Sequence, residues 1–501
     1  MFFPLLGYAP DADPTTPGVL VDCDLLIPTL KGFKALPGDS NAGITAGPSA
    51  VASMFTMRNL DGTNRILAGT EGSASAKTAS LYDVNASGWT NRDGAGGPYT
   101  ATGSMRWSFA TYGEQVLAAQ KGTGLLKSTA PSTDFTAVAG APQASIVISV
   151  LDFLMAFNTT EGTYGDSPNR WWCCAAGNID SWTADVATQA TTGLLTDGDG
   201  GIVAAGRVGS NVVAFKPNFA YLGQYVGAPQ VWSWVRIPGD GIGAWSHHSL
   251  VNVEGLGVLW PGRDNFYLFD GTRAVALEND VAETFLADLD VSQAQSMVGY
   301  HDRSGWRVYW WYPSNSGGAG DGTLDRVVVF NYRSKKWGFG AKTVAYPFEY
   351  LEPGITYDDL GSFYATWDDL PVSPYDIAFK TAGTHAPGFV GTNNIIYKME
   401  GEGNNCSYKT GFAGQDGLIM HSKRFRPRFM TKPSTGEMTH LYADNVGDAT
   451  ASVRTAVAAR ALVDGAFDSV FAARWHQVEH RYTGSMEITG LDVEMEPDSE
   501  E

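Results

Sequence analysis

The stretch Phe266-Tyr267-Leu268-Phe269-Asp270-Gly271 is a short hydrophobic strand that runs directly into an Asp-Gly turn. Similar stretches return roughly every 45 residues, which is close to the length of one propeller-blade repeat. The other copies are Leu81-Tyr82-Asp83 with Trp89, Leu125-Leu126 with Asp134-Phe135, Trp171-Trp172-Cys173-Cys174 with Trp182, Tyr221-Leu222 with Trp232 and Trp234, Val327-Val328-Val329-Phe330-Asn331-Tyr332 with Trp337, and a degenerate copy at Ile395-Ile396-Tyr397. One repeat is too small to bury its own apolar face, so neighbouring repeats must stack. The sequence therefore predicts an all-β fold built on a six- or seven-bladed β-propeller.

The composition agrees with many short strands and tight turns. Of the 501 residues, 44% are apolar, only 17% are charged, 59 are glycine and 15 are tryptophan. A propeller can reach this length because each interface between blades forms its own small core. We therefore expect one large domain with an appendage.

Composition shifts divide the chain into three expected parts. Residues 1–45 form an extended N-terminal arm, because three prolines between positions 10 and 17 restrict the backbone. Residues 46–403 form the propeller, with inserted loops in the later blades, notably 346–392, where a binding or gating element is expected. Residues 404–501 form a small C-terminal β domain, and the one helix-like stretch, 280–286, is a connector between blades.

The net charge of −19 argues against tight binding of nucleic acid, although DNA could pass nearby without being held. The four cysteines have no ligand spacing, so free thiols are expected and no cofactor is predicted. The N-terminus lacks a basic region and is interrupted by Pro4, so we expect no signal peptide. No run approaches the about 20 apolar residues of a membrane helix, so no membrane span is expected.

Two motifs have a catalytic appearance. The string His476-Gln477-Val478-Glu479-His480 matches the H-x-x-E-H zinc pattern, which requires a helix, but its surroundings predict a strand that separates Glu479 from the histidines. Asp197-Gly198-Asp199-Gly200 resembles the start of a calcium loop, but no Glu stands twelve positions on, and an Asp-Gly turn is expected. We therefore expect no catalytic, cofactor-binding or metal-binding residues and no enzyme.

The basic cluster from Lys423 to Arg428 is the densest group of cations in the chain. On a strand, alternation places Lys423, Phe425 and Pro427 on one face and Arg424, Arg426 and Arg428 on the other. In an acidic protein, such an arginine row is expected to dock on carboxylates of a partner subunit rather than on phosphate.

Several segments resemble the tail-tube hub proteins of short-tailed bacteriophages, which are also called nozzle or packaged-DNA stabilisation proteins. The segments are 9–20 (APDADPTTPGVL), 22–33 (DCDLLIPTLKGF), 255–260 (GLGVLW) with 266–271 (FYLFDG), 329–332 (VFNY) with 336–337 (KW), and 488–494 (ITGLDVE). Together they span most of the chain as a pattern rather than as one diagnostic signature.

The resemblance implies a structural virion protein that forms a homohexameric ring below the portal and adaptor. It implies partners in the portal or adaptor ring and in tail fibre or spike proteins, with genomic double-stranded DNA passing through the ring without specific binding. It also implies localisation in the phage tail, after assembly in the host cytoplasm. The arm and the C-terminal β domain are then expected to contact neighbouring subunits or the adaptor.

Two other classes of function fit a propeller. A propeller enzyme that acts on glycans predicts carboxylates at the central tunnel, with Asp197, Asp358 and Asp368 as the residues to place; Asp358-Asp359 and Asp368-Asp369 are adjacent pairs in an expected loop. A receptor-binding propeller predicts a sugar platform of exposed aromatics such as Trp367 and Tyr375.

Overall fold

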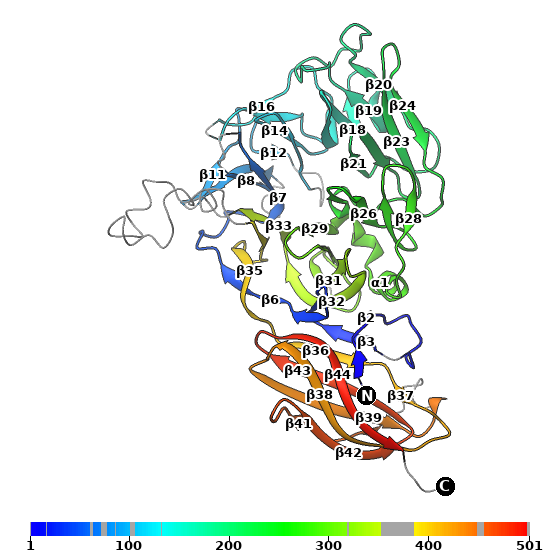
Figure 1. The fold of residues 1–501 in the computed structure, drawn as a ribbon. Helices are drawn as coiled ribbons and strands as arrows, with labels where there is room; N and C mark the ends of the chain where they lie inside the picture. Colours follow the sequence, from blue (N-terminus) through cyan, green and yellow to red (C-terminus); the bar gives the residue numbers. More distant parts are fainter. Residues whose placement is uncertain are drawn as a thin grey trace, which may run out of the picture.

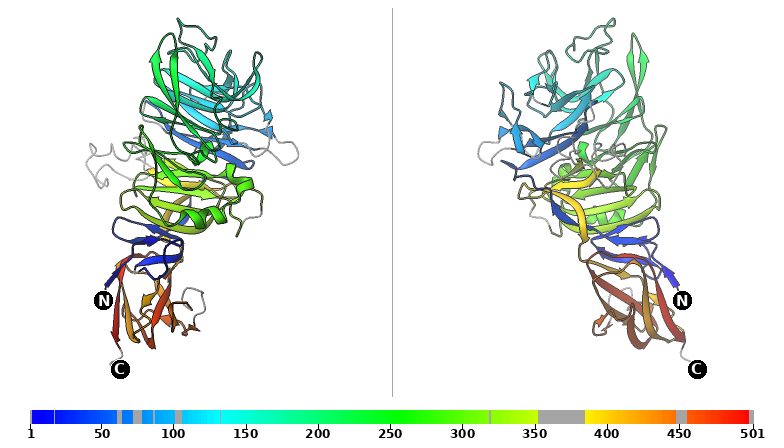
Figure 2. Two further views of the ribbon diagram at one scale, coloured as in Figure 1. Left: turned by 90° about the vertical axis from the view of Figure 1, so that its right-hand side faces the viewer. Right: turned by 60° about the vertical axis from the view of Figure 1, so that its left-hand side comes forward.

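The computed structural model describes residues 2–16, 18–60, 64–71, 78–85, 87–100, 106–131, 133–317, 320–351, 385–447 and 455–497. The molecule is elongated, with a ring of sheets at one end and the C-terminal strands at the other (Figure 1). The N-terminal strands lie between these two parts, as the two further views in Figure 2 also show. The helical elements that lie wholly within the described residues are α1 (Ala282–Asp288) and the 3-10 turns η1 (His247–Ser249) and η2 (Val291–Ser296). Because α1 covers most of the expected stretch 280–286, that prediction is confirmed.

Successive groups of four antiparallel strands form the blades, which are numbered here in chain order. Blade 1 is β7 (Val51–Arg58), β8 (Asn64–Thr70), β10 (Leu81–Asn85) and β11 (Gly88–Asn91), blade 2 is β13 (Ser108–Tyr112), β14 (Gln115–Ala119), β15 (Leu126–Ser128) and β16 (Thr136–Ala137), blade 3 is β17 (Gln143–Val150), β18 (Phe153–Glu161), β19 (Gly165–Cys173) and β20 (Thr191–Leu194), and blade 4 is β21 (Ala204–Val208), β22 (Asn211–Phe215), β23 (Ala220–Gly227) and β24 (Val231–Arg236). Blade 5 is β25 (Val251–Val253), β26 (Gly257–Pro261), β27 (Phe266–Phe269) and β28 (Ala274–Ala276). Blade 6 is β29 (Val298–Asp302), β30 (Arg307–Tyr312), β31 (Leu324–Asn331) and β32 (Lys336–Val344). Blade 7 is β33 (Tyr346–Leu351), β34 (His385–Val390), β35 (Ile396–Gly403) and the N-terminal strand β6 (Pro37–Asn41). A separate two-stranded sheet joins β9 (Thr78–Ala79) to β12 (Tyr99–Thr100).

The first strands of the blades form a closed ring. Among the described residues, six of the blades are separate four-stranded sheets, and blade 6 is the first part of a ten-stranded sheet. The innermost strands contact one another in the order β7, β13, β17, β21, β25, β29 and β33, and β33 contacts β7 again. The prediction of an all-β propeller with six or seven blades is therefore confirmed.

Blade 5 contains the repeat stretch 266–271 and shows why such a stretch forms a blade strand. Phe266, Tyr267 and Phe269 are buried between neighbouring blades. The strand ends where Gly271 adopts a positive φ of 102°, a conformation that glycine adopts without steric cost. The carboxylate of Asp270 accepts hydrogen bonds from the backbone N–H groups of Thr272 at 2.8 Å and Arg273 at 3.1 Å, which fixes the turn.

The N-terminal segment pairs with both the propeller and the C-terminal strands. Its strands are β1 (Phe2–Pro4), β2 (Gly7–Tyr8), β3 (Val19–Asp24), β4 (Leu26–Pro28) and β5 (Phe33–Ala35), followed by β6. Although β6 falls inside the stretch expected for the arm, it pairs with β35 as the outer strand of blade 7. This pairing closes the propeller by joining the two ends of the repeat array.

The C-terminal strands form two packed sheets. They are β36 (Cys406–Thr410), β37 (Ala413–Gly414), β38 (Met420–Thr431), β39 (Thr435–Ala443), β40 (Thr455–Ala456), β41 (Arg460–Ala461), β42 (Phe467–Ala473), β43 (Trp475–Thr483) and β44 (Glu487–Pro497). One sheet has the order β2-β3-β36-β43-β39-β40, and the other contains β5-β44-β38-β42. Buried side chains of both sheets, including Phe425, Tyr408 and Val478, belong to one hydrophobic cluster, so the sheets form a sandwich.

One continuous sheet joins the propeller to this sandwich. Its order is β29-β30-β31-β32-β4-β5-β44-β38-β42, so arm strands β4 and β5 bridge blade 6 and the C-terminal strands. The buried cluster follows the same path, from Trp310 in blade 6 through Leu26 and Phe33 in the arm to Phe425 in β38. The two parts of the molecule therefore share a core.

The expected insertion 346–392 is only partly described. Its flanks form β33 and β34, whose strands pair directly with each other. Residues 352–384, which include Asp358, Trp367, Asp368 and Tyr375, lie outside the described residues. A gating role for this insertion stays a prediction.

Candidate functional site

A polar cluster links opposite blades at the centre of the propeller. We call it the axial network and define it as Arg106, Ser108, His247, His248 and Tyr346. Arg106, just before blade 2, donates to the carbonyl oxygens of Ala52 in blade 1 and of Ser296, before blade 6, the latter at 2.9 Å. Its guanidinium also lies 5.2 Å from the centre of the Tyr346 ring in blade 7.

The two histidines of the network connect the remaining blades. His247 Nε2 lies 3.2 Å from Ser108 Oγ in blade 2, and His247 Nδ1 accepts a hydrogen bond from the Ala205 N–H of blade 4 at 3.5 Å. Because Nδ1 is an acceptor, the proton of this imidazole is on Nε2 and points at Ser108. Ser108 Oγ also exchanges hydrogen bonds with the Val147 backbone of blade 3, at 3.1 and 3.3 Å.

The environment of the axial network keeps both histidines neutral. Desolvation lowers the pKa of His247 to about 4 and also lowers the pKa of His248, with smaller contributions from His247 and Arg106. These side chains are half-buried by area, but blades surround them on all sides, and this crowding sets the pKa. Desolvation also raises the pKa of Tyr346 to about 12, so its hydroxyl, 2.9 Å from His248 Nδ1, stays protonated.

The chemistry of the axial network fits structural linkage. Within the described residues no carboxylate hydrogen-bonds to it, and Glu71 acts on Arg106 only electrostatically. Its side chains connect blade 2 with blades 5 and 6 across the ring, so the centre of one propeller is not an open passage for a DNA duplex. Sequence analysis missed this network; the adjacent His247-His248 pair before an inner strand was the available signal.

The H-x-x-E-H string lies on strand β43, which confirms the strand prediction. His476 and His480 are buried inside the sandwich, whereas Glu479 is turned toward solvent, within 3.7 Å of Lys409 and 2.8 Å of Arg481. His476 Nδ1 lies 3.0 Å from His440 Nε2. No group of three or more His, Cys, Asp or Glu side chains in the described ranges is arranged to hold a metal ion.

The Asp197-Gly198-Asp199-Gly200 stretch forms a turn region after β20. Gly198 and Gly200 adopt positive φ values of 79° and 81°. The backbone carbonyl of Asp197 accepts hydrogen bonds from Lys216 Nζ at 3.1 Å and from the Tyr221 hydroxyl. The predicted Asp-Gly turn is therefore confirmed, and the hydrogen bonds of Asp197 go to Lys216 and Tyr221 rather than to the axial network.

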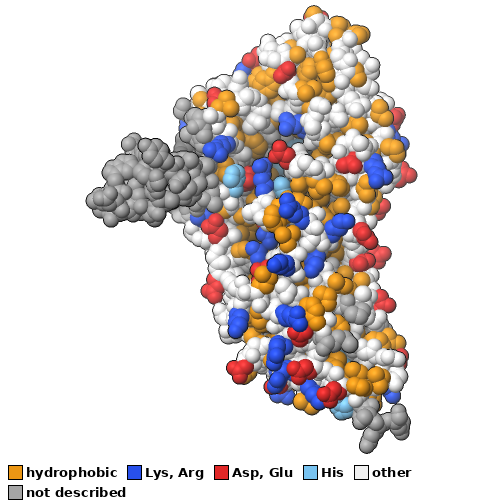
Figure 3. All heavy atoms as spheres, viewed as in Figure 1, with side chains coloured by type: hydrophobic (Ala, Val, Ile, Leu, Met, Phe, Trp, Pro, Cys, Tyr) orange, Lys and Arg blue, Asp and Glu red, His pale blue; other side chains and the backbone are white. Residues whose placement is uncertain are grey.

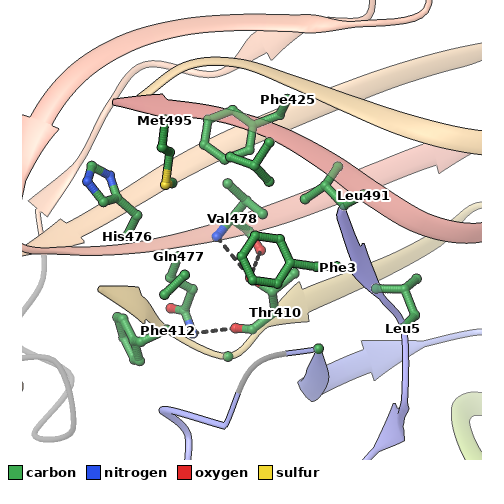
Figure 4. Close-up of a pocket in the computed structure, with 14 residues that line it drawn as sticks. Phe3, Leu5, Thr410, Phe412, Phe425, His476, Gln477, Val478, Leu491 and Met495 are labelled. Carbon is green, nitrogen blue, oxygen red and sulfur yellow. Dashed lines mark hydrogen bonds between the residues drawn. The ribbon is translucent and has the colours of Figure 1, made fainter. Parts of the chain in front are cut away.

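A small apolar cavity of about 40 Å³ lies beside His476 in the sandwich. Figure 4 shows Phe3 and Leu5 of the N-terminal segment beside Phe425, Val478 and Leu491 of the two sheets. Gln477 Nε2 donates to the Thr410 carbonyl at 2.7 Å, which satisfies a polar group at its wall. Ligand pockets usually hold about 300–1,000 Å³, so this void is a packing gap beneath the arm rather than a binding site.

Three of the four cations in the basic cluster, Lys423, Arg424 and Arg428, are paired within their own chain, whereas Arg426 is exposed. Arg424 Nε donates to Asp468 Oδ1 and Arg428 Nε to Asp492 Oδ2, each at 2.6 Å, and Lys423 Nζ bonds to Glu496. Phe425 and Pro427 are buried, as expected, but the placement of Lys423 on their face was wrong. A bulge between Ser422 and Arg424 shifts the alternation, so Lys423 is exposed.

Lys and Arg side chains gather along the middle of one face of the molecule. Figure 3 shows this column running from the propeller to the C-terminal sandwich, over the region where Figure 1 labels β31, β32, β44 and β38. These strands belong to the continuous ten-stranded sheet. On the face shown in Figure 3, the cations of an acidic chain are therefore concentrated over this sheet.

A polar cleft of about 960 Å³ lies at one end of blade 5. We call it the blade 5 cleft; its charged, amide and ring side chains include Arg207, Asn211, Glu254, Asp270, Arg303 and Tyr332. The strands of blade 5 hold three to five residues, whereas β23 and β31 of the flanking blades hold eight. The cleft lies between turns of blades 4, 5 and 6, and the sequence contained no motif for it.

All four cysteines, Cys23, Cys173, Cys174 and Cys406, are free, as expected, and the structure places all of them in the interior. Burial raises the pKa of the Cys174 thiol to about 11 and that of Cys406 to about 12, so neither is a thiolate near neutral pH. None of the helices in the described part of the chain has the length and apolar character needed to cross a lipid bilayer.

The fold defines a β-propeller protein joined to a C-terminal β-sandwich. No protein-family model matches the chain, and no curated protein matches it. Among solved structures, it is similar to YCF48 bound to D1 peptide, with 10% sequence identity and a TM-score of 0.36 over 75% of this chain and 98% of that one. YCF48 from Cyanidioschyzon merolae gives 10% identity and a TM-score of 0.35 over 71% and 97%. Likeness at this level carries no functional argument, and the propeller assignment rests on strand pairing.

Proposed function

We propose that this chain is a structural virion protein, the tail hub or nozzle of a short-tailed bacteriophage. In this role it forms a homohexameric ring below the portal and adaptor, retains the packaged DNA and conducts it during ejection. Tail fibre or spike proteins attach to the same assembly. The sequence resemblance in segments 9–20, 255–260 and 488–494 is the origin of this proposal.

The observation that carries the proposal is the continuous sheet between the propeller and the sandwich. A conduit under the pressure of packaged DNA needs subunits that do not hinge, and a shared core with bridging strands β4 and β5 supplies this rigidity. The axial network favours a conduit between subunits, because side chains cross the centre of each propeller. The charge of −19 favours sliding of DNA rather than retention on the protein surface.

The test is electron microscopy of the purified chain, alone and mixed with a portal–adaptor complex of a short-tailed phage. We expect six-fold rings that cap the adaptor, with the propellers arranged around a central channel. A monodisperse monomer that never joins the portal–adaptor complex would contradict the proposal. Hydrolysis of an oligosaccharide by the purified chain would favour the alternative of a glycan-active enzyme.

A further inference from the structure

We propose that the blade 5 cleft binds a saccharide that carries a carboxylate group. The cleft is built from three blades of one chain, so this binding does not depend on assembly into a ring. Its volume of about 960 Å³ is large enough for several sugar units. The side chains around it supply the three kinds of contact that such a ligand needs: cationic, hydrogen-bonding and aromatic.

The cationic contact comes from two arginines on opposite sides of the cleft. Arg207 is the penultimate residue of strand β21 of blade 4, and Arg303 lies in the turn between β29 and β30 of blade 6. Both side chains are exposed, and neither guanidinium has an ion pair or hydrogen bond to another described residue. In a chain with 53 acidic and 34 basic residues, two unpaired arginines at one cleft are available to an anionic ligand. The planar guanidinium matches a carboxylate in a two-point contact.

The acidic residues of the cleft distinguish a sugar from an acidic peptide. Hydrogen bonds from Thr272, first from its hydroxyl and then from its backbone, lower the pKa of Asp270 to about 2, so this group stays a carboxylate. Glu254, in the turn between β25 and β26, has no ion pair to another described residue. Carboxylates accept hydrogen bonds from hydroxyl groups but repel other carboxylates. A hydroxyl-rich ligand with few negative charges therefore fits better than a polyanionic peptide.

The amide and ring groups complete the lining. Asn252 Nδ2 donates to the Arg207 carbonyl at 3.0 Å, which joins the cleft walls of blades 4 and 5. Tyr332 and His301 come from blade 6, where the tyrosine hydroxyl lies 3.3 Å from His301 Nε2. Burial lowers the pKa of His301, so its ring is neutral at pH 7. Neutral rings can pack against the C–H faces of a sugar while the polar groups bind its hydroxyls.

The experiment is a glycan array printed with carboxylate-bearing and neutral saccharides, followed by affinity measurement on the strongest acidic glycan by biolayer interferometry. We expect the unaltered chain to bind acidic glycans, and R207A and R303A each to lose about tenfold in affinity, the loss expected for one charge-assisted contact. R58A removes an exposed arginine at the end of β7 in blade 1 and serves as the matched control with unchanged affinity. Melting temperatures of all three variants should equal that of the unaltered chain, because the substituted side chains are exposed.

Three results would overturn the proposal. The first is no acidic glycan above background on the array. The second is equal affinity of R207A, R303A and the unaltered chain. The third is equal or tighter binding of a polyglutamate peptide, which would assign the cleft to an acidic protein segment. None of these results bears on ring formation, so a failed cleft and a failed tail-hub role can be told apart.

Discussion

Buried histidines show how the sandwich satisfies polar groups in its core. His476 Nε2 donates to the carbonyl oxygens of Met420 and Ala473, both at 3.0 Å, so its Nδ1 must accept a hydrogen bond from His440 Nε2. His440 Nδ1 then accepts from the Ser469 hydroxyl at 2.9 Å. Every ring nitrogen of this pair has a partner while both imidazoles are neutral. An additional proton would introduce a positive charge between two apolar sheets.

This arrangement predicts loss of stability in mild acid. Burial lowers the pKa of His440 from 6.5 to about 4 and that of His480 to about 3. The unfolded chain therefore takes up these protons as the pH falls below about 6.5, while the folded chain does not. The stabilisation is complete above pH 6.5 and is lost toward pH 4, by about 3 kcal/mol for His440 alone. Urea denaturation at pH 7, 6 and 5 measures this slope.

The variant H440Q provides the comparison. A glutamine amide can donate to His476 Nδ1 and accept from Ser469, so the hydrogen-bond chain is preserved without the titrating group. We expect the number of protons taken up on unfolding to fall by about one between pH 6.5 and 4, so the unfolding free energy should depend less steeply on pH. Identical free energies of the unaltered chain at pH 7 and pH 5 would contradict the argument.

At the scale of single residues, sequence alone predicted the strand environment of His476 but not its partner. Alternation around Val478 showed that the H-x-x-E-H string could not form a helical zinc site. The partner His440 stands 36 positions away on β39, and only the register of the sheet brings the two rings together. The partners of Arg106 and of His247 were likewise not predictable. Each residue lies outside a strand and contacts blades that are distant in the sequence.

At the scale of elements, the arm strands decide whether the propeller and the sandwich behave as one body. Residues in β4 and β5 pair with both parts: Leu26 lies opposite Phe339 of blade 6, and Phe33 lies opposite Ile488 of β44. Leu26 and Phe33 are each 0% exposed. The junction is therefore a packed interior rather than a surface contact.

Truncation of one side chain at this junction should uncouple the two parts. F33A removes a fully buried ring, which costs about 3–5 kcal/mol at such positions. Because the lost contacts lie between the parts, we expect differential scanning calorimetry to resolve two transitions in F33A and one in the unaltered chain. F157A, which removes an equally buried ring between blades 3 and 4, is the control and should lower the melting temperature without separating the sandwich. A single transition in F33A would contradict the coupling.

The blades were predictable and the arm pairings were not, for a physical reason. Each blade carries its own strands and turns within a short stretch, so a motif such as 266–271 reports a local structure. The partner of β6 is β35, and the pair Asn41 and Tyr397 is separated by most of the chain. Prolines showed that the arm could not fold alone, but they contain no information about which sheet edge it joins.

At the scale of the whole molecule, net charge and charge placement act together. The chain carries −19, yet Lys and Arg side chains form a column on the face shown in Figure 3, and in β38 Lys423, Arg424 and Arg428 are neutralised by carboxylates of the adjacent strands. Asp468, Asp492 and Glu496 therefore bind cationic groups that could otherwise bind phosphate. In the tail-hub role that we propose, this pairing favours passage of DNA, because an unpaired arginine row would hold the duplex.

Removing these carboxylates should create DNA binding. We expect the unaltered chain not to retain a duplex at 150 mM salt in a filter-binding or gel-shift assay, whereas the triple variant D468N, D492N and E496Q should retain it at low salt. Because three cationic side chains become free to bind phosphates, a plot of the logarithm of affinity against the logarithm of salt concentration should have a slope of about −3. D240N, which frees Arg236 on blade 4 outside this row, is the matched control and should not bind. Retention of DNA by the unaltered chain, or no gain in the triple variant, would show that the row does not govern contact with DNA.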